Sequence, residues 1–153
     1  MYIGKKEQPY KRPESVLVVV YTQSNEILAL RRKQPNYFWQ SVAGSIKWDE
    51  TPEQAARREL YEETGISDTK LLIDWHLCNE FLIYPMWRHR YAAGIISNKE
   101  HLFSLKIEAP CRVILDTREH SESRWFSVSE AMAQISSHTN RDAINTIIRA
   151  ADR

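Results

Sequence analysis

Two patterns of hydrophobic and polar positions divide this chain into strands and helices. Short runs rich in β-branched and aromatic residues predict strands, because such side chains pack well on the faces of a sheet. The predicted strands cover residues 15–21, 27–30, 38–42, 71–83, 91–96, 102–105 and 123–126. The turn-like Gln23-Ser24-Asn25 between the first two strands predicts a hairpin.

The clearest helix is predicted over Thr51–Thr64. Thr51 can cap its start, Pro52 suits the first helical position, and Gln54 completes a T-x-x-Q capping box. Gly65 supplies a left-handed stop.

Two more helices are predicted near the end of the sequence. Ser127 and Glu130 form a second capping box that opens a helix toward Ile135, and residues 140–151 predict a terminal helix. Strands on both sides of a central helix indicate an α/β or α+β fold. No repeat or linker interrupts the 153 residues, so we expect one domain spanning residues 1–153.

The predicted helix at 51–64 lies within a motif that carries chemistry. Residues 44–66, GSIKWDETPEQAARRELYEETGI, match G-x5-E-x7-R-E-U-x-E-E-x-G-U, where U is aliphatic. A chance match at one site is on the order of 10⁻⁸. Glu59, Glu62 and Glu63 share one helix face at spacings where like charges each cost a few tenths of a kcal/mol, so the face favours a cation. Carboxylate oxygens suit Mg²⁺, with Mn²⁺ as a second possibility.

A solvated acidic helix, with Arg58 and Glu62 as a surface ion pair, is the simpler interpretation of these residues taken singly. The complete motif with both glycines argues against it. Ala55 and Ala56 are expected to leave room beside the acidic face. Gly44 is expected to let the backbone of a loop approach a metal or a phosphate.

The motif resembles the box of the Nudix hydrolases. That resemblance implies a Nudix-type α/β/α sandwich with a central mixed β-sheet and a loop-helix-loop catalytic box. It also implies hydrolysis of a nucleoside diphosphate derivative or a similar polyphosphate. By the same resemblance Glu59 and Glu63 are direct metal ligands, Glu62 is a ligand or a base, Glu50 supports the site from behind, and Arg58 orients the glutamates.

The family often supplies its base from a loop outside the box. Glu119, just before the predicted strand at 123–126, is the candidate for this role and for a further metal ligand. A loop carboxylate with no partner is the alternative. The neighbouring His120 is expected to be an exposed loop histidine.

Outside the box, short motifs together resemble the bacterial dihydroneopterin triphosphate pyrophosphatases. The motifs are YKRP at 10–13, RR at 31–32, FWQSV at 38–42, RHRY at 88–91 and SHTNR at 137–141. This similarity implies that Lys11 and Arg32 hold a triphosphate, that Ser137 contacts the substrate, and that Ala43 and Gly44 border it. Arginine and lysine suit phosphate because they form charge-assisted hydrogen bonds.

Two positions depart from these patterns. Ala43 stands where the pterin enzymes can use a hydroxyl residue, and Ser45 replaces a second glycine that many Nudix proteins carry. Phe38 or Trp39 could stack on a pterin, although a place in the core is the favoured interpretation for both.

The function predicted first is therefore Mg²⁺-dependent release of pyrophosphate from 7,8-dihydroneopterin triphosphate. The alternative is a house-cleaning nucleoside triphosphate pyrophosphatase. A nucleotide-sensing Nudix domain without turnover is disfavoured because the box glutamates are all present.

The net charge of the chain limits the kinds of ligand that it is expected to bind. Lys plus Arg number 21 and Asp plus Glu 20, a formal net charge of +1, which argues against a nucleic-acid polymer as ligand. Nothing resembles a membrane span or a leader, so a cytoplasmic protein is expected, and Cys78 and Cys111 are expected to be reduced. The sequence leaves the oligomeric state open.

Overall fold

The computed structural model describes residues 9–152, which build a mixed sheet of seven strands. The strand order is β3-β2-β1-β6-β5, with β4 also paired to β1 and β7 to β2. Strands β1 and β6 are parallel and the other pairs antiparallel. The strands are β1 (Glu14–Thr22), β2 (Ile27–Arg32), β3 (Trp39–Gln40), β4 (Val42–Ser45), β5 (Leu72–Leu82), β6 (Ser97–Ile107) and β7 (His120–Phe126).

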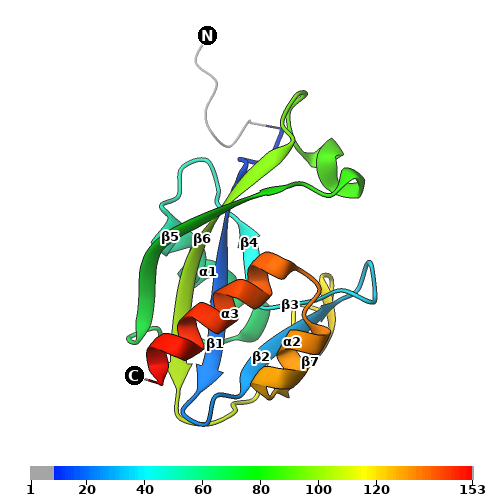
Figure 1. Cartoon of the computed structure of the whole chain (residues 1–153). Coiled ribbons are helices and arrows are strands. Elements are labelled where there is room, and N and C mark those ends of the chain that lie inside the picture. Colours follow the sequence, from blue (N-terminus) through cyan, green and yellow to red (C-terminus); the bar gives the residue numbers. More distant parts are fainter. Residues whose placement is uncertain (1–8, 153) are drawn as a thin grey trace.

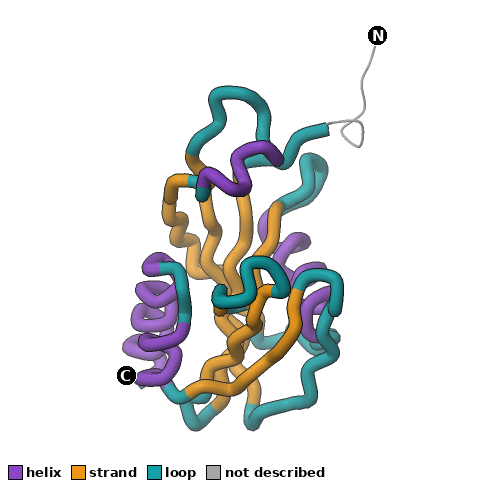
Figure 2. The backbone as a smooth tube through the Cα atoms, turned by 90° about the vertical axis from the view of Figure 1, so that its right-hand side faces the viewer, coloured by secondary structure: helices purple, strands orange, loops and turns teal. Residues whose placement is uncertain are grey.

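Helices cover both faces of this sheet (Figures 1 and 2). Helix α1 (Pro52–Thr64) packs on one face, and α2 (Val128–Gln134) and α3 (His138–Ala151) lie on the other. A short 3₁₀ helix, η2 (Pro85–Arg90), follows β5. The architecture is the predicted α/β/α sandwich on a mixed sheet.

Strand β1 supplies both cores because its side chains alternate between the faces. Val16, Val18 and Val20 pack in the α1 core, whereas Leu17 and Val19 pack in the α3 core. A strand buried on both faces reads as a continuous apolar run, which explains the sequence of the segment.

The predicted capping boxes and the Gly65 stop are confirmed, whereas the terminal helix begins at His138, two residues before the predicted start. Thr51 and Gln54 form the capping box of α1, and the Gly65 N–H bonds the Tyr61 carbonyl at φ 78°. Ser127 and Glu130 form the second capping box, at α2.

The strand predicted at 91–96 is wrong. Gly94 has a φ of 86° and the Ile95 N–H bonds the Ala92 carbonyl, so the segment turns, and β6 begins only at Ser97. The polar run at 97–101 was missed because its strand conformation depends on pairing with β1 and β5 rather than on local pattern.

The strand predicted at 38–42 is two strands. The chain changes partner at Ser41, whose N–H bonds the Asn140 Oδ1 atom at 2.8 Å. Strand β3 therefore pairs with β2 and β4 with β1.

Both cysteines, Cys78 and Cys111, are exposed and free, as expected. Among the described residues, no helix has the length and apolar character that crossing a membrane requires.

Candidate active site

Two glutamates of α1 are buried where the helix meets the sheet. Glu63 is 1% exposed and Glu59 is 8% exposed. Within residues 9–152, neither carboxylate oxygen of Glu63 has a hydrogen-bond partner. Buried carboxylates are normally paired, so this arrangement indicates that a partner is meant to come from outside the chain.

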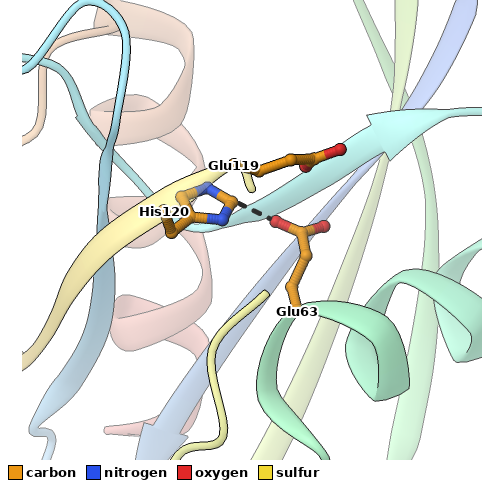
Figure 3. A group of neighbouring side chains, drawn as sticks. All are labelled: Glu63, Glu119 and His120. Carbon is orange, nitrogen blue, oxygen red and sulfur yellow. Dashed lines mark ion pairs between the residues drawn. The ribbon is translucent and has the colours of Figure 1, made fainter. Parts of the chain in front are cut away.

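Glu119 and His120 approach Glu63 from the start of β7 (Figure 3). One ligand atom from each of these three residues lies within 4.8 Å of the others. The Nε2 atom of His120 is 3.7 Å from Oε1 of Glu63, too far for a hydrogen bond. The group thus combines one buried carboxylate, one exposed carboxylate and one buried imidazole.

The electrostatics of this group call for positive charge. Burial raises the pKa of the Glu63 carboxyl well above its usual value, and the neighbouring Glu59 and Glu119 add to the effect. Burial, reinforced by Arg32, lowers the pKa of His120 to about 4, so the imidazole is neutral at pH 7. A divalent cation would supply the missing charge to the carboxylates, and carboxylate oxygens are ligands that Mg²⁺ and Mn²⁺ accept. The residues therefore fit a metal ion.

The expectation for His120 is wrong. Its side chain is 1% exposed, and it opens β7 opposite Arg32 of β2. A strand that begins three residues earlier than predicted carries the side chain inward, and only the pairing with β2 determines that start.

Arg58 donates hydrogen bonds to four residues around the acidic face. Its Nε and Nη2 atoms bond the two Glu50 oxygens at 2.6 and 2.8 Å. Nη1 bonds Glu59 at 2.7 Å and Glu62 at 3.1 Å, and Nη2 also bonds the Ser45 carbonyl at 3.0 Å. These partners raise the pKa of Arg58, and the hydrogen bonds with Glu50 have the largest effect. The planar guanidinium thereby holds the middle of α1 against the end of β4 and fixes the Glu59 carboxylate.

Replacing Arg58 by Lys is expected to lower the free energy of unfolding by about 1–2 kcal/mol, because an ammonium cannot span Glu50 and Glu59 together. Turnover should fall about 10-fold through loss of Glu59 positioning. The matched control is Arg57→Lys, whose exposed side chain pairs with Glu53. Equal effects of the two changes, measured by thermal unfolding and initial rates, would contradict the role given to Arg58.

Gly44 leaves room for a side chain of the box. It lies within β4, and a Cβ atom at this position would stand 2.2 Å from the Glu59 Cδ atom. The close neighbour is therefore the box carboxylate itself. Ala55 and Ala56 are both fully buried in the core between α1 and the sheet.

A cleft of about 1360 Å³ opens beside the acidic group. The five residues predicted to bind substrate all line it: Lys11, Arg32, Ala43, Gly44 and Ser137. Glu59, Arg58 and Glu119 line it as well. Residues far apart in the sequence thus line one cleft, as the residues of a ligand-binding site do.

The cations of the cleft lie close enough to influence one another. Desolvation by the cleft walls, with Arg90 nearby, lowers the pKa of Lys11. The same two effects lower the pKa of Arg32. The Arg32 guanidinium stacks on Trp87, 4.8 Å from the ring centroid. Cations held together in this way gain from an anionic ligand.

Sequence reasoning missed Trp87, although Arg90 belonged to one of the quoted motifs. Both reach the cleft from η2, whose position no local pattern determines. Phe38 lines the cleft and packs edge-on against Trp87, whereas Trp39 packs against Phe126 in the α3 core.

Glu50 and Glu62 lie at the margin of the site. Glu50 accepts two hydrogen bonds from Arg58 and one from the Lys47 N–H, consistent with support from behind. The Glu62 side chain is 49% exposed and bonds Arg58. It lies outside the group formed by Glu63, Glu119 and His120.

Residues 11–146 match the family model described as the NUDIX domain. The chain belongs to the Nudix family. A Nudix relative from Escherichia coli strain K12, dihydroneopterin triphosphate diphosphatase, is 39% identical over 147 residues, 94% of this chain and 97% of that protein. The protein of the same name from Haemophilus influenzae is 40% identical over 139 residues, 88% of this chain and 87% of that one. The solved structure of the E. coli dihydroneopterin triphosphate pyrophosphohydrolase superposes with a TM-score of 0.86 at 38% identity, covering 94% of this chain and 99% of that chain.

Proposed function

We propose that this Nudix protein is an enzyme that hydrolyses 7,8-dihydroneopterin triphosphate to dihydroneopterin monophosphate and pyrophosphate. The observation that carries the proposal is the likeness to the E. coli enzyme, which extends over 94% of the chain. The cleft adds chemical support, because its acidic group lies beside cations that suit a triphosphate.

The metal of the proposed site is Mg²⁺, with Mn²⁺ as the alternative. Glu59, Glu63 and Glu119 are proposed to hold it. Glu59 and Glu63 are buried, and Glu119, just before β7, has a carboxylate oxygen within 4.8 Å of one of Glu63. When bound, the ion would neutralise phosphate oxygens and lower the pKa of a water molecule. His120, neutral and buried 3.7 Å from Glu63, is proposed to restrict the movement of that carboxylate by packing beside it.

The protein's own groups would perform the remaining steps. Lys11 and Arg32 bind the triphosphate. Ala43 and Gly44 of β4 and Ser137 at the start of α3 border the substrate. Glu119 is exposed at the cleft, so it can take the proton of the attacking water, with Glu62 as the alternative base. Arg58 keeps Glu59 in place by a direct hydrogen bond, and Glu50 in turn holds the Arg58 guanidinium. The chemistry is mainly positioning and charge stabilisation, as expected for phosphoryl transfer.

The second candidate is a nucleoside triphosphate pyrophosphatase that uses the same acidic group. The feature that favours it is Ala43, which provides no hydroxyl where the pterin enzymes can use one. Either function takes a small triphosphate rather than a nucleic-acid polymer.

A panel of dihydroneopterin triphosphate and the four dNTPs, assayed with Mg²⁺, separates the two functions. We expect kcat/KM to be at least about 10-fold higher for the pterin than for any dNTP. The cations of the cleft bind the triphosphate of every substrate equally, so the difference comes from contacts with the ring. A dNTP that exceeds the pterin by a hundredfold would replace this proposal with the second candidate.

A further inference from the structure

One carboxyl group in the cleft remains unexplained by the metal site. Glu100 lies on β6, in register with Ser15 of β1 and Asn79 of β5, and lines the cleft. Its side chain is 8% exposed, and its Oε1 atom is buried without a hydrogen-bond partner. Leaving such an atom unsatisfied costs about 1–3 kcal/mol, so a structural role alone does not account for it.

Polar, uncharged residues lie next to Glu100: Ser15 and Asn79 are opposite it in the sheet, and the Thr139 hydroxyl acts on its carboxyl group. Ser15 accepts a hydrogen bond from Asn98 at 2.7 Å, and Thr139 lies 2.9 Å from the Ser137 hydroxyl. Within residues 9–152, none of the ion pairs includes Glu100. Burial raises its pKa to about 7, against an opposing effect of the Thr139 hydroxyl. The carboxyl therefore gains most from donors that a ligand brings.

The ring of the proposed substrate carries suitable donors. A 2-amino-4-oxopyrimidine ring, present in pterins and in guanine, has an amino group next to a ring N–H. Two parallel donors can bond the two oxygens of a carboxylate, in the same way as the two N–H groups of an arginine guanidinium do. Adenine presents an acceptor beside its amino group, so it matches an amide or a protonated carboxyl instead.

Resting on the proposed function, we propose that Glu100 is the residue that binds the ring edge of the substrate and selects the aminopyrimidinone. The triphosphate is held at the other part of the cleft, by the cations and the acidic group. Glu100 thus sets specificity and KM and takes no part in the chemical step.

The variant Glu100→Gln tests this inference, because glutamine has the same shape but offers one donor and one acceptor. We expect kcat/KM for dihydroneopterin triphosphate to fall at least about 10-fold, mainly through KM. For dATP, measured as substrate or as competitive inhibitor, we expect a change of less than about 3-fold, because an amide matches the adenine edge. The ratio of kcat/KM for the pterin to that for dATP then falls at least about 3-fold.

Three controls make the result decisive. Glu80→Gln removes an exposed carboxylate of the same cleft, already bonded by Ser97, and should leave the ratio unchanged. Glu100→Asp keeps both acceptors and should retain the preference for the pterin over dATP. The temperature of unfolding of each variant shows whether the variant is folded. An unchanged value for dATP shows that the rest of the site is intact.

An equal fall for both ligands, or an unchanged ratio, would overturn the inference about Glu100. If the wild-type protein does not hydrolyse dihydroneopterin triphosphate, the proposed function fails separately. The ratio of dGTP to dATP then tests Glu100, since guanine carries the same two donors.

Discussion

Glu63→Gln is expected to lower kcat by at least about 10³-fold in the Mg²⁺-dependent reaction. Glu63 is the most deeply buried acid of the group, and both its oxygens lack partners. An amide removes the negative charge that would hold the ion while keeping the shape of the side chain. Loss of a preorganised charged group at a phosphoryl-transfer site typically has effects of this size.

The same variant should separate metal binding from folding. Without metal, Glu63→Gln should unfold at an equal or higher temperature, because the wild-type protein bears the cost of an unpaired buried carboxylate. Added Mg²⁺ should stabilise the wild type and not the variant. Glu53→Gln, exposed on the first turn of the same helix, is the control and should behave as wild type. A near-normal rate for Glu63→Gln would mean that the metal site lies elsewhere.

Alanine at position 44 is expected to lower kcat about 10²-fold, the second largest effect. The added methyl group would occupy the space of the Glu59 carboxylate, so either Glu59 or β4 must move. Displacement of about 1 Å at a catalytic group is enough for such a loss. We expect a simultaneous loss of about 1–3 kcal/mol in the free energy of unfolding.

A double-mutant cycle identifies the cause of this loss. In a Glu59→Ala background the carboxylate is absent, and Gly44→Ala should then cost less than about 0.5 kcal/mol. Chemical denaturation of the four proteins supplies the numbers. A cost that stays the same in both backgrounds would place the strain in the backbone of β4 and contradict the contact with Glu59.

The box could be predicted from sequence because its signals are local. The caps of α1, Thr51 and Gly65, act through hydrogen bonds within four residues, and the acidic face follows from the helical repeat. The fold class follows from the same regularity, since apolar runs such as that of β1 indicate strands without knowledge of their partners.

The remainder of the site depends on contacts between distant segments. His120 is buried because β7 pairs with β2, about 90 residues earlier in the chain. Glu100 lies in a polar run that becomes a strand only between β1 and β5. Trp87 reaches the cleft through a 3₁₀ helix whose place depends on packing against Phe38. Neither periodicity nor spacing carries such information.

The identity of the products tests the central claim most directly. Wild-type protein incubated with dihydroneopterin triphosphate and Mg²⁺ should release one pyrophosphate for each dihydroneopterin monophosphate formed, and chelation of the metal should stop both. The two products can be counted together by phosphorus NMR. Release of orthophosphate alone, or no turnover of the pterin under conditions where a dNTP is hydrolysed, would contradict the account.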